Sequence, residues 1–548
     1  MAAVKQKEKD AARKPKGQAL PRAKTPEEAG ISSLRLADWI RDLLQSNIEV
    51  HSLMVLRGGK VAFEAFRAPF TPKTPHMLFS VSKAVTSTAV GLAAAEGLLT
   101  LEDRVIDLLP AYAPETPDET LEKLTVRHLL TMTAGKQMSM TADKSKNRWA
   151  EDFFEGKWEY APGEGWSYTN ENIYMLSLIL RRLTGQSMVD YLMPRLFEPL
   201  GIARPTWETD GGGVEAGGWG LSMTTEDFAK YMLLYQQKGM WQGQRILPAE
   251  WVEASTTWQA DNHKSEEDGN SGYGYCFWLN ELPNSYRADG FFSQLGYVYG
   301  DDDAVVVINA AEPMSHKVKE CFARHFPGIF IEPGSEPPVA EVFRQSRLTL
   351  PALPELYETP RSKMIEHRIE GRLIAFSQRS QFVNDVFGYP VSVMPLAVFY
   401  MSANKAGHIN FVRFRFQADT CKFSWSEGAE RNTVLCGMDG KARQCKIRLG
   451  GVDFVVACTA AWEGGSKLHV WIRPMGHVAQ RRLVFTFGSD TVRMLPRSSP
   501  SLAAVAQYIS GNASNLFHNP LVIRLAEVSM SKVALVAEPL HFGYFLTK

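Results

Sequence analysis

The spacing of apolar and polar positions changes along the chain and predicts where its elements lie. Two β-rich runs flank Gly58-Gly59, which predicts a hairpin. Mostly helical spacing follows over residues 101–258, and strand-like runs return over residues 272–309 before a last helix near 315–325. This order predicts an α+β domain, in which a helical segment is inserted into an antiparallel sheet flanked by helices.

A different pattern occupies the C-terminal part of the chain. Residues 410–416, 468–472 and 483–487 alternate apolar and polar side chains with a period of two. Such alternation is typical of antiparallel strands that have one face in water. We therefore expect a C-terminal antiparallel β domain, and the pattern leaves open whether it is a barrel or a sandwich.

Composition shifts give the boundaries of four expected segments. Residues 1–24 are rich in Lys and Ala and contain no long apolar run, which predicts a disordered basic tail. The α+β domain is expected over residues 25–332, a Pro-rich linker over 333–360 and the β-rich domain over 361–548.

The overall composition excludes several classes of function. The 548 residues carry a formal net charge of +0, which does not favour binding to nucleic acid or to an anionic membrane surface. We find no apolar run long enough to span a bilayer and no secretory signal at the N-terminus. The six cysteines form no Cys-x-x-Cys pair, so we expect no metal site, no cofactor and a cytoplasmic location.

The strongest chemical signal is Phe79-Ser80-Val81-Ser82-Lys83, at the head of a small-residue apolar run that ends near Gly97. Residues three apart share a helix face, so Ser80 and Lys83 can meet. A lysine among apolar neighbours has a lowered pKa and can take the proton of a serine nucleophile. The alternative is an ordinary helix-capping serine followed by a first-turn lysine.

A second group of polar residues follows a Pro-Gly turn at Pro162-Gly163. Tyr168 can exchange protons with a nearby Ser–Lys pair, and the Asn170 amide can bridge the lysine and a substrate carbonyl. The alternative is a buried tyrosine beside a helix-capping asparagine.

Five short motifs, taken together and in order, identify a family. They are Leu78–Lys83, Leu124–Gly135, Tyr168-Thr169-Asn170, Gly218–Asp227 and Gly272-Tyr273-Gly274-Tyr275. In this order they resemble the serine β-lactamase-related hydrolases of class C-like architecture, which include penicillin-binding-protein-like esterases, D-aminopeptidases and 6-aminohexanoate-dimer hydrolase. The resemblance covers roughly residues 25–330.

The resemblance implies a fold and a role for each matching residue. The fold is the β-lactamase/transpeptidase-like fold. Ser80 is the nucleophile, Lys83 its base partner, Tyr168 the general base and acid, and Asn170 the amide that positions the substrate. No metal or cofactor takes part in this chemistry.

The chain departs from the family at its third motif, a Lys- or His-x-Gly on the strand that lines the cleft. No Lys or His stands before Gly290, and the nearest charges are Arg287 and Asp289. We expect Arg287, Gly290, Phe292 and Ser293 to contribute to substrate binding. The backbone N–H of this strand can complete an oxyanion hole with that of Ser80.

The sequence supports three hypotheses of function. The first is a serine hydrolase that cleaves an ester or amide of a small-molecule or peptide-like acyl substrate. The second is a transacylase on the same site, and the third is a catalytically inactive binding or scaffold protein with this fold. The acyl group, the leaving group and the oligomeric state stay open.

Overall fold

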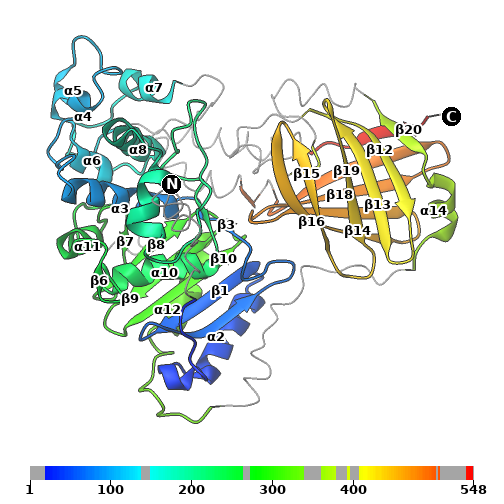
Figure 1. The fold of residues 1–548 in the computed structure, drawn as a ribbon. Helices are drawn as coiled ribbons and strands as arrows, with labels where there is room; N and C mark the ends of the chain where they lie inside the picture. Colours follow the sequence, from blue (N-terminus) through cyan, green and yellow to red (C-terminus); the bar gives the residue numbers. More distant parts are fainter. Residues whose placement is uncertain are drawn as a thin grey trace, which may run out of the picture.

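The structure has two parts, which lie side by side in Figure 1. An N-terminal domain contains the described residues up to 338, and a C-terminal barrel contains those from 360 onward. The computed structural model describes residues 19–136, 148–262, 272–338, 360–377, 392–394, 407–501, 504–505 and 538–546. The linker predicted over residues 333–360 therefore lies mostly outside the described residues.

An antiparallel sheet forms the centre of the N-terminal domain. The hairpin predicted at Gly58-Gly59 forms two of its strands, and β10 pairs with the first of them. Among the described residues the sheet has six strands, in the order β2 (Lys60–Phe66), β1 (Val50–Arg57), β10 (Ala304–Ala310), β9 (Gln294–Tyr299), β8 (Ser285–Gly290) and β7 (Trp278–Leu279).

Helices cover both faces of this sheet (Figure 1). On one face, α2 (Ser33–Gln45) and α12 (Ser315–His325) bury Trp39 and Phe322 against strand side chains such as Tyr297. On the other face, α3 (Val81–Ala95) and α10 (Thr225–Gln236) share a larger core with the helical insert. The predicted α+β class, with an antiparallel sheet flanked by helices, is confirmed.

The helical insert lies between β2 and β7 in the chain, where the sequence predicts mostly helical structure. The longest helix, α8 (Asn170–Thr184), ends at Gly185, whose φ of 67° is the left-handed value that favours glycine. The shorter elements are α4 (Val105–Leu108), α5 (Glu119–Lys123), α6 (Val126–Leu130), α7 (Trp149–Glu155), α9 (Met188–Leu192), η2 (Met193–Phe197) and α11 (Ala249–Thr256).

One predicted strand is much shorter than expected. The pattern over residues 272–279 predicts a strand, but the strand formed is Trp278–Leu279, β7, and Tyr273 makes isolated bridges to Ala260 and Trp278. The segment before it contains Gly272 and Cys276, whose φ values of 100° and 67° are incompatible with a strand. These residues instead form turns that pack against the insert.

The predicted β-rich domain is a closed barrel with a helix, α14 (Lys363–Ile369), against one end. Closure is made where Gly437 of β14 pairs with Thr459 of β16. The described strands are β11 (Leu373–Phe376), β12 (Ile409–Phe416), β13 (Thr420–Glu427), β14 (Glu430–Gly437), β15 (Arg443–Leu449), β16 (Val452–Glu463), β17 (Lys467–Pro474), β18 (Gln480–Phe487), β19 (Thr491–Ser499) and β20 (His541–Phe545).

The structure describes residues 19–24, the end of the segment that the sequence predicts as a disordered tail. Arg22 pairs with Val61 at the edge of β2, and its guanidinium binds Glu64 and Glu226 at 3.1 and 2.6 Å. Leu20 is buried, and its amide donates to Glu226 of α10 at 2.6 Å. These contacts explain why residues 19–24 are ordered despite their polar composition, while residues 1–18 lie outside the described residues.

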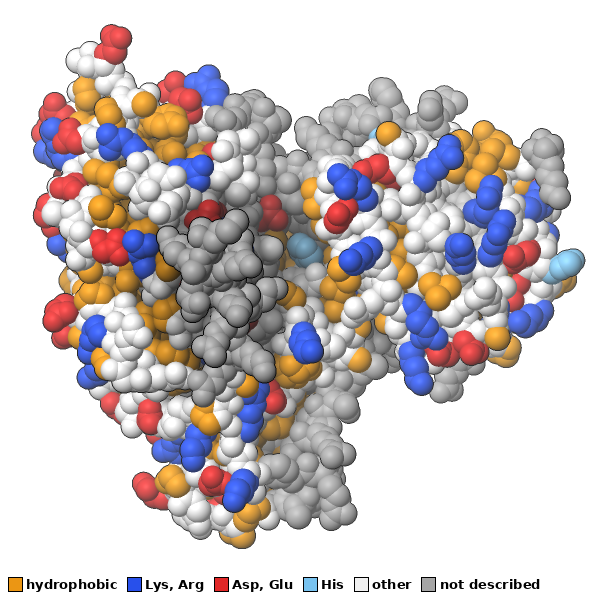
Figure 2. Space-filling view, in the orientation of Figure 1, with side chains coloured by type: hydrophobic (Ala, Val, Ile, Leu, Met, Phe, Trp, Pro, Cys, Tyr) orange, Lys and Arg blue, Asp and Glu red, His pale blue; other side chains and the backbone are white. Residues whose placement is uncertain are grey.

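The described surface carries both signs of charge. Figure 2 shows acidic and basic side chains interspersed over the described part of the face that it draws. No helix among the described residues combines the length and apolarity that crossing a bilayer requires.

Candidate active site

Ser80 stands at the first turn of α3 but does not cap the helix with its side chain. It occupies the N-cap position, and no side-chain capping bond is formed. The residue before it, Phe79, has a φ of 48°, a left-handed conformation that is costly for a bulky residue. This sharp turn presents Ser80, half-buried, at the head of α3. The amides of Val81 and Ser82 donate to the Leu78 and Phe79 carbonyls at 3.1 and 3.0 Å.

Lys83 lies directly beneath Ser80, as the three-residue spacing predicts. Its Nζ is 2.9 Å from Ser80 Oγ, and it donates hydrogen bonds to Asn170 Oδ1 at 2.7 Å and to the Gly218 carbonyl at 2.8 Å. Only 1% of Lys83 is exposed. Burial lowers the pKa of Lys83 to about 7, so a large fraction of it is neutral at neutral pH.

The three partners of Lys83 fix where its lone pair points when it is neutral. The Asn170 carbonyl oxygen and the Gly218 carbonyl can only accept hydrogen bonds. A neutral amine has two N–H groups, which these two acceptors use. Its lone pair is then directed at Ser80 Oγ, where it can accept the hydroxyl proton.

Polar side chains of α3 hold the segment 217–221 along the helix. Thr86 Oγ1 donates to the Gly217 carbonyl at 3.0 Å, and the Leu221 amide donates to Ser82 Oγ at 3.1 Å. Gly218 also packs closely on α8, because an added Cβ there would lie 3.0 Å from Asn170 Oδ1. The small and hydroxyl residues of the run therefore align the carbonyl that orients Lys83.

Tyr168 covers the other side of the lysine. Its half-buried ring has its centroid 4.7 Å from Lys83 Nζ, a contact that favours the protonated lysine. Three more aromatic rings hold Tyr168 in place, with centroids 5.2 to 6.3 Å apart within the group: Trp166, Tyr273 and Trp278. These rings surround the Tyr168 ring and restrict its orientation.

Gly290 brings the end of β8 against the start of α3. An added Cβ at Gly290 would collide with the backbone oxygen of Leu78, two residues before Ser80. Glycine is therefore required for this close approach. The approach places the backbone of the predicted third motif beside the nucleophile.

The structure orients Arg287 toward the opposite face of the sheet. In β8, Tyr286, Ala288 and Gly290 face the α3 side, and the alternate position of Arg287 pairs with Tyr297 on the α12 side. The Arg287 guanidinium bonds to Asp289 at 3.0 Å and to Asn280 at 2.7 Å, and Asp289 also binds Lys319 of α12. The Arg287 guanidinium also lies 5.5 Å from the ring centroid of Trp278, one of the rings that surround Tyr168. The role of Arg287 in substrate binding stays a prediction.

Phe292 and Ser293 lie in the turn that follows β8. They form a left-handed turn, with φ values of 62° and 66°, and neither side chain is more than 2% exposed. Ser293 Oγ donates to the Glu312 carbonyl at 3.0 Å, and the Phe292 ring packs on Phe79 at 5.4 Å. Their side chains support the turn beside the nucleophile and have no surface to offer a substrate.

Sequence reasoning missed several residues that complete the site. Gly218 acts through its backbone carbonyl, so its residue type does not reveal this role, although its Gly-rich segment is part of the family resemblance. Trp166, Tyr273 and Trp278 form the frame around Tyr168, and two of them lie in stretches that the motifs include or adjoin. The clustering of aromatic residues near Tyr168 and Tyr273 in the sequence is a signal of this frame, and a search for charged and nucleophilic groups does not detect it.

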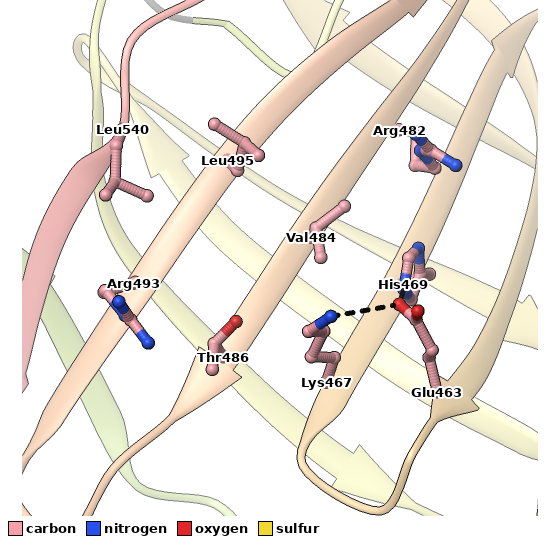
Figure 3. Close-up of a pocket in the computed structure, with 9 residues that line it drawn as sticks. All are labelled: Glu463, Lys467, His469, Arg482, Val484, Thr486, Arg493, Leu495 and Leu540. Carbon is pink, nitrogen blue, oxygen red and sulfur yellow. Dashed lines mark hydrogen bonds and ion pairs between the residues drawn. The ribbon is translucent and has the colours of Figure 1, made fainter.

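A separate hollow of about 420 Å³ lies on the outer face of the barrel (Figure 3). Within it, His469 Nε2 lies 2.7 Å from Glu463, and Lys467 lies 3.7 Å from the same carboxylate. Its lining residues are Glu463, Lys467, His469, Arg482, Val484, Thr486, Arg493, Leu495 and Leu540. None is a serine or cysteine, and we assign no reaction to it. Among the described residues, no group of three or more His, Cys, Asp or Glu is placed to hold a metal ion.

Comparison with known proteins gives one family. A family model described as Beta-lactamase matches residues 36–320, just over half of the chain. This span contains Ser80, Lys83, Tyr168 and Asn170.

Individual relatives are distant. The 6-aminohexanoate-dimer hydrolase of Paenarthrobacter ureafaciens is 28% identical over 254 residues, which cover 42% of this chain and 63% of the relative. An uncharacterised protein of Alkalihalophilus pseudofirmus is 25% identical over 40% of this chain and 66% of its own length. The chain thus spans less than two thirds of either curated relative. The octameric penicillin-binding protein homologue from Pyrococcus abyssi, a solved structure, is 17% identical with a TM-score of 0.43, covering 84% of this chain and 97% of that one.

Proposed function

Because this chain belongs to the Beta-lactamase family, we propose that it is a serine hydrolase that cleaves an ester or amide through an acyl-enzyme on Ser80. The observation that carries the proposal is the contact of 2.9 Å between Lys83 Nζ and Ser80 Oγ. An ordinary capping serine would turn its hydroxyl to the helix N–H groups instead.

In the first half-reaction, Ser80 Oγ attacks the carbonyl carbon of the substrate. The Oγ–C bond forms while neutral Lys83 takes the hydroxyl proton. The backbone N–H of Ser80 and that of the strand end after Gly290 stabilise the oxyanion. The bond to the leaving group then breaks, and Tyr168 relays the proton from Lys83 to the departing oxygen or nitrogen.

In the second half-reaction, water replaces the leaving group. Tyr168 and Lys83 accept a proton from the water as its oxygen bonds to the acyl carbon, and Ser80 regains a proton as its ester bond breaks. Asn170 is available throughout to bind both Lys83 and a substrate carbonyl, since its amide has a donor and an acceptor end.

The preferred substrate is an acyl donor without a carboxylate beside the scissile bond. On the α3 side of β8, the position two residues before Gly290 is Ala288, which supplies no positive charge. Arg287 faces the α12 side and is paired with Asp289. A neutral ester or amide requires no ion pair at this position.

The test is hydrolysis of p-nitrophenyl butyrate together with labelling by a fluorophosphonate probe. We expect both in the native protein, and Ser80→Ala should abolish both. Ser87→Ala is the matched control, because Ser87 is a fully buried serine of the same helix and its hydroxyl makes no hydrogen bond within the described structure. This variant should keep the native rates.

Two outcomes would contradict the proposal. One is a native protein that neither turns over the ester nor reacts with the probe, which would favour an inactive binding protein. The other is equal labelling of the native protein and Ser80→Ala. Analysis of products with an added alcohol distinguishes hydrolysis from acyl transfer, because a transacylase would form the new ester.

A further inference from the structure

The barrel touches the N-terminal domain through the turn between β17 and β18, residues 474–479, which we call the docking turn. The Met77 amide donates to the Gly476 carbonyl at 2.7 Å. Met77 belongs to β3 (His76–Met77), whose other edge pairs with β4 (Ser222–Met223). The docking turn therefore occupies the open edge of β3, three residues before Ser80.

Apolar contacts extend from the docking turn to the nucleophile. Val478 and Ala479 are buried in one cluster with Met77, Phe79 and Phe292. Phe79 directly precedes Ser80, and Phe292 lies in the turn that follows Gly290. The Phe79 and Phe292 rings, which contact the barrel, therefore lie directly beside the start of α3 and the end of β8.

A buried ion pair fixes the base of the docking turn. Arg473, at the end of β17, binds Glu49 at 2.9 Å, and Glu49 also lies 3.0 Å from His51. His51 contacts His76 of β3 at 2.9 Å. The polar chain thus ends on the same short strand that the docking turn pairs with.

The docking turn has no room for a side chain at its tip. Gly476 has a φ of 80°, and an added Cβ would collide with the backbone oxygen of Pro75. Both the backbone conformation and the close approach require glycine. A residue with a Cβ would push the docking turn away from β3.

We propose that the docking turn of the barrel positions Ser80 for reaction by holding β3 and the Phe79 ring, with Gly476 and Val478 as positioning residues. This inference rests on the proposed function and adds a part to its active site. The barrel is then a component of the catalytic unit in addition to being a domain of its own.

The physical reason is the strained turn at Phe79. A bulky residue with a φ of 48° relaxes to a negative φ unless its surroundings hold it. Such a rotation would move the Ser80 amide and hydroxyl together. Displacements of about 1 Å in a catalytic group lower rates by about 100-fold.

The test compares Gly476→Ala with a matched control in the same barrel. Gly451, in the turn between β15 and β16, has a φ of 82°, and nothing lies within 4 Å of an added Cβ. Gly451→Ala thus carries the same backbone strain without touching the N-terminal domain. We measure the rate of fluorophosphonate labelling of Ser80 and the kcat and KM for p-nitrophenyl acetate, a substrate with a small acyl group.

We expect Gly476→Ala to lower the labelling rate and kcat by about tenfold or more with little change in KM. Gly451→Ala should stay within about twofold of the native protein, since it leaves the docking turn intact. Equal rates in the two variants would overturn the inference. A native protein that fails to label would instead overturn the proposed function, so the two failures are distinguishable.

A second pair of variants covers the case in which Gly476→Ala does not fold. Val478→Ala removes methyl groups next to Phe79 and Phe292, and Val484→Ala removes the same groups from the outer face of β18, where Val484 is half-buried. Val478→Ala should lower kcat by about threefold or more while Val484→Ala does not. Unchanged kcat in Val478→Ala would contradict the role given to its side chain.

Discussion

Two opposing effects act on the proton of Lys83. Burial disfavours its charge and brings its pKa down to about 7, while the negative charge of Glu171 acts in the other direction. The Tyr168 ring also favours the charged form. The outcome is a lysine that can both take a proton from Ser80 and hold it until the leaving group departs.

The proposed role of Lys83 predicts a pH profile. Since only neutral Lys83 can accept the Ser80 proton, kcat/KM for a neutral ester should be flat above about pH 7 and fall by about tenfold per unit below it. Lys83→Met should lose about 10²- to 10⁴-fold on the plateau above about pH 7 and should lack the acid limb. A profile without an acid limb near neutrality would contradict this assignment.

Glu171→Gln moves the acid limb in a predictable direction. The Glu171 carboxylate raises the pKa of Lys83, so its removal lowers that pKa. The midpoint of the kcat/KM profile should then shift to lower pH, with the plateau rate largely kept. An unchanged midpoint, or one shifted to higher pH, would show that Glu171 does not act on Lys83.

The residues of the site differ in how far sequence could predict them. Ser80 and Lys83 are one helical turn apart, so their contact follows from helix geometry alone. Arg287 could not be placed, because a shift of one residue in a strand moves a side chain to the other face. The sequence did not single out Gly218 as a hydrogen-bond acceptor for Lys83, because Gly218 acts through its backbone carbonyl and every residue has one.

At the scale of elements, the site depends on three short segments meeting at one point. The end of β8 approaches the start of α3 at Gly290, where an added Cβ would collide with the Leu78 oxygen. The segment 217–221 approaches α8 at Gly218, where an added Cβ would lie 3.0 Å from Asn170 Oδ1. The Leu78 amide donates to the Leu221 carbonyl at 2.8 Å and joins two of these segments. The reacting groups are thus aligned by backbone contacts between elements.

Gly290→Ala tests the contact between β8 and α3. The new Cβ would collide with the Leu78 oxygen and separate the strand end from Ser80, so we expect kcat to fall by about 10- to 100-fold. The steric cost to stability should be about 1–3 kcal/mol. Ester hydrolysis and thermal unfolding are the two measurements.

Gly300→Ala is the control for this prediction. Gly300 begins the turn between β9 and β10, and an added Cβ would lie 2.7 Å from the Asn284 oxygen. It should therefore lower the melting temperature without lowering kcat at a temperature where the protein is folded. A similar loss of kcat in both variants would mean that activity reports only on the stability of the sheet.

The elements themselves were largely predictable, and their exceptions have local causes. The hairpin at Gly58-Gly59, the end of α8 at Gly185 and the alternation in the barrel strands all follow from local patterns. The strand predicted over 272–279 failed because Cys276 adopts a positive φ, which no pattern of apolar residues reveals.

At the scale of the whole molecule, the interface between the two parts contains His51 and His76, which are buried, and His477, which is half-buried. Burial lowers the pKa of His51 and of His477 to about 4, and it also lowers that of His76. Charges on Arg473 and Arg67 act in the same direction on His51, while Glu49 opposes them. The packed interface therefore holds these histidines neutral.

The buried histidines predict that acid weakens the protein. Their pKa values are lower in the folded protein than the usual 6.5, so their contribution to stability is complete above about pH 6.5 and is lost as the pH falls toward about 4. A shift of this size corresponds to about 3 kcal/mol for one histidine. The melting temperature should fall steadily between pH 6.5 and 4.5.

His51→Gln should reduce this dependence, and His367→Gln, on the exposed side of α14, should not. Glu49 does not account for the effect. Although burial opposes it, Arg473 and His51 hold the pKa of Glu49 at about 2, so Glu49 stays charged across this range. Identical slopes in both variants would contradict the assignment to His51.

The contact between the docking turn and β3 lay beyond prediction from sequence. Met77 and Gly476 are separated by almost 400 residues, and neither segment contains a motif that predicts a contact with the other. The sequence predicts a separate β-rich domain. In the structure, one turn of that domain bonds to Met77, which precedes Ser80 by three residues in the chain.

The most direct measurement of the central claim is the mass of the protein during turnover. The native protein is mixed with a slowly hydrolysed p-nitrophenyl ester, quenched in acid and analysed intact and after digestion. An acyl-enzyme on Ser80 predicts a gain equal to one acyl group, located on the peptide that contains Ser80 and absent from Ser80→Ala. An acyl group on another residue, or ester turnover by Ser80→Ala at the native rate, would contradict it.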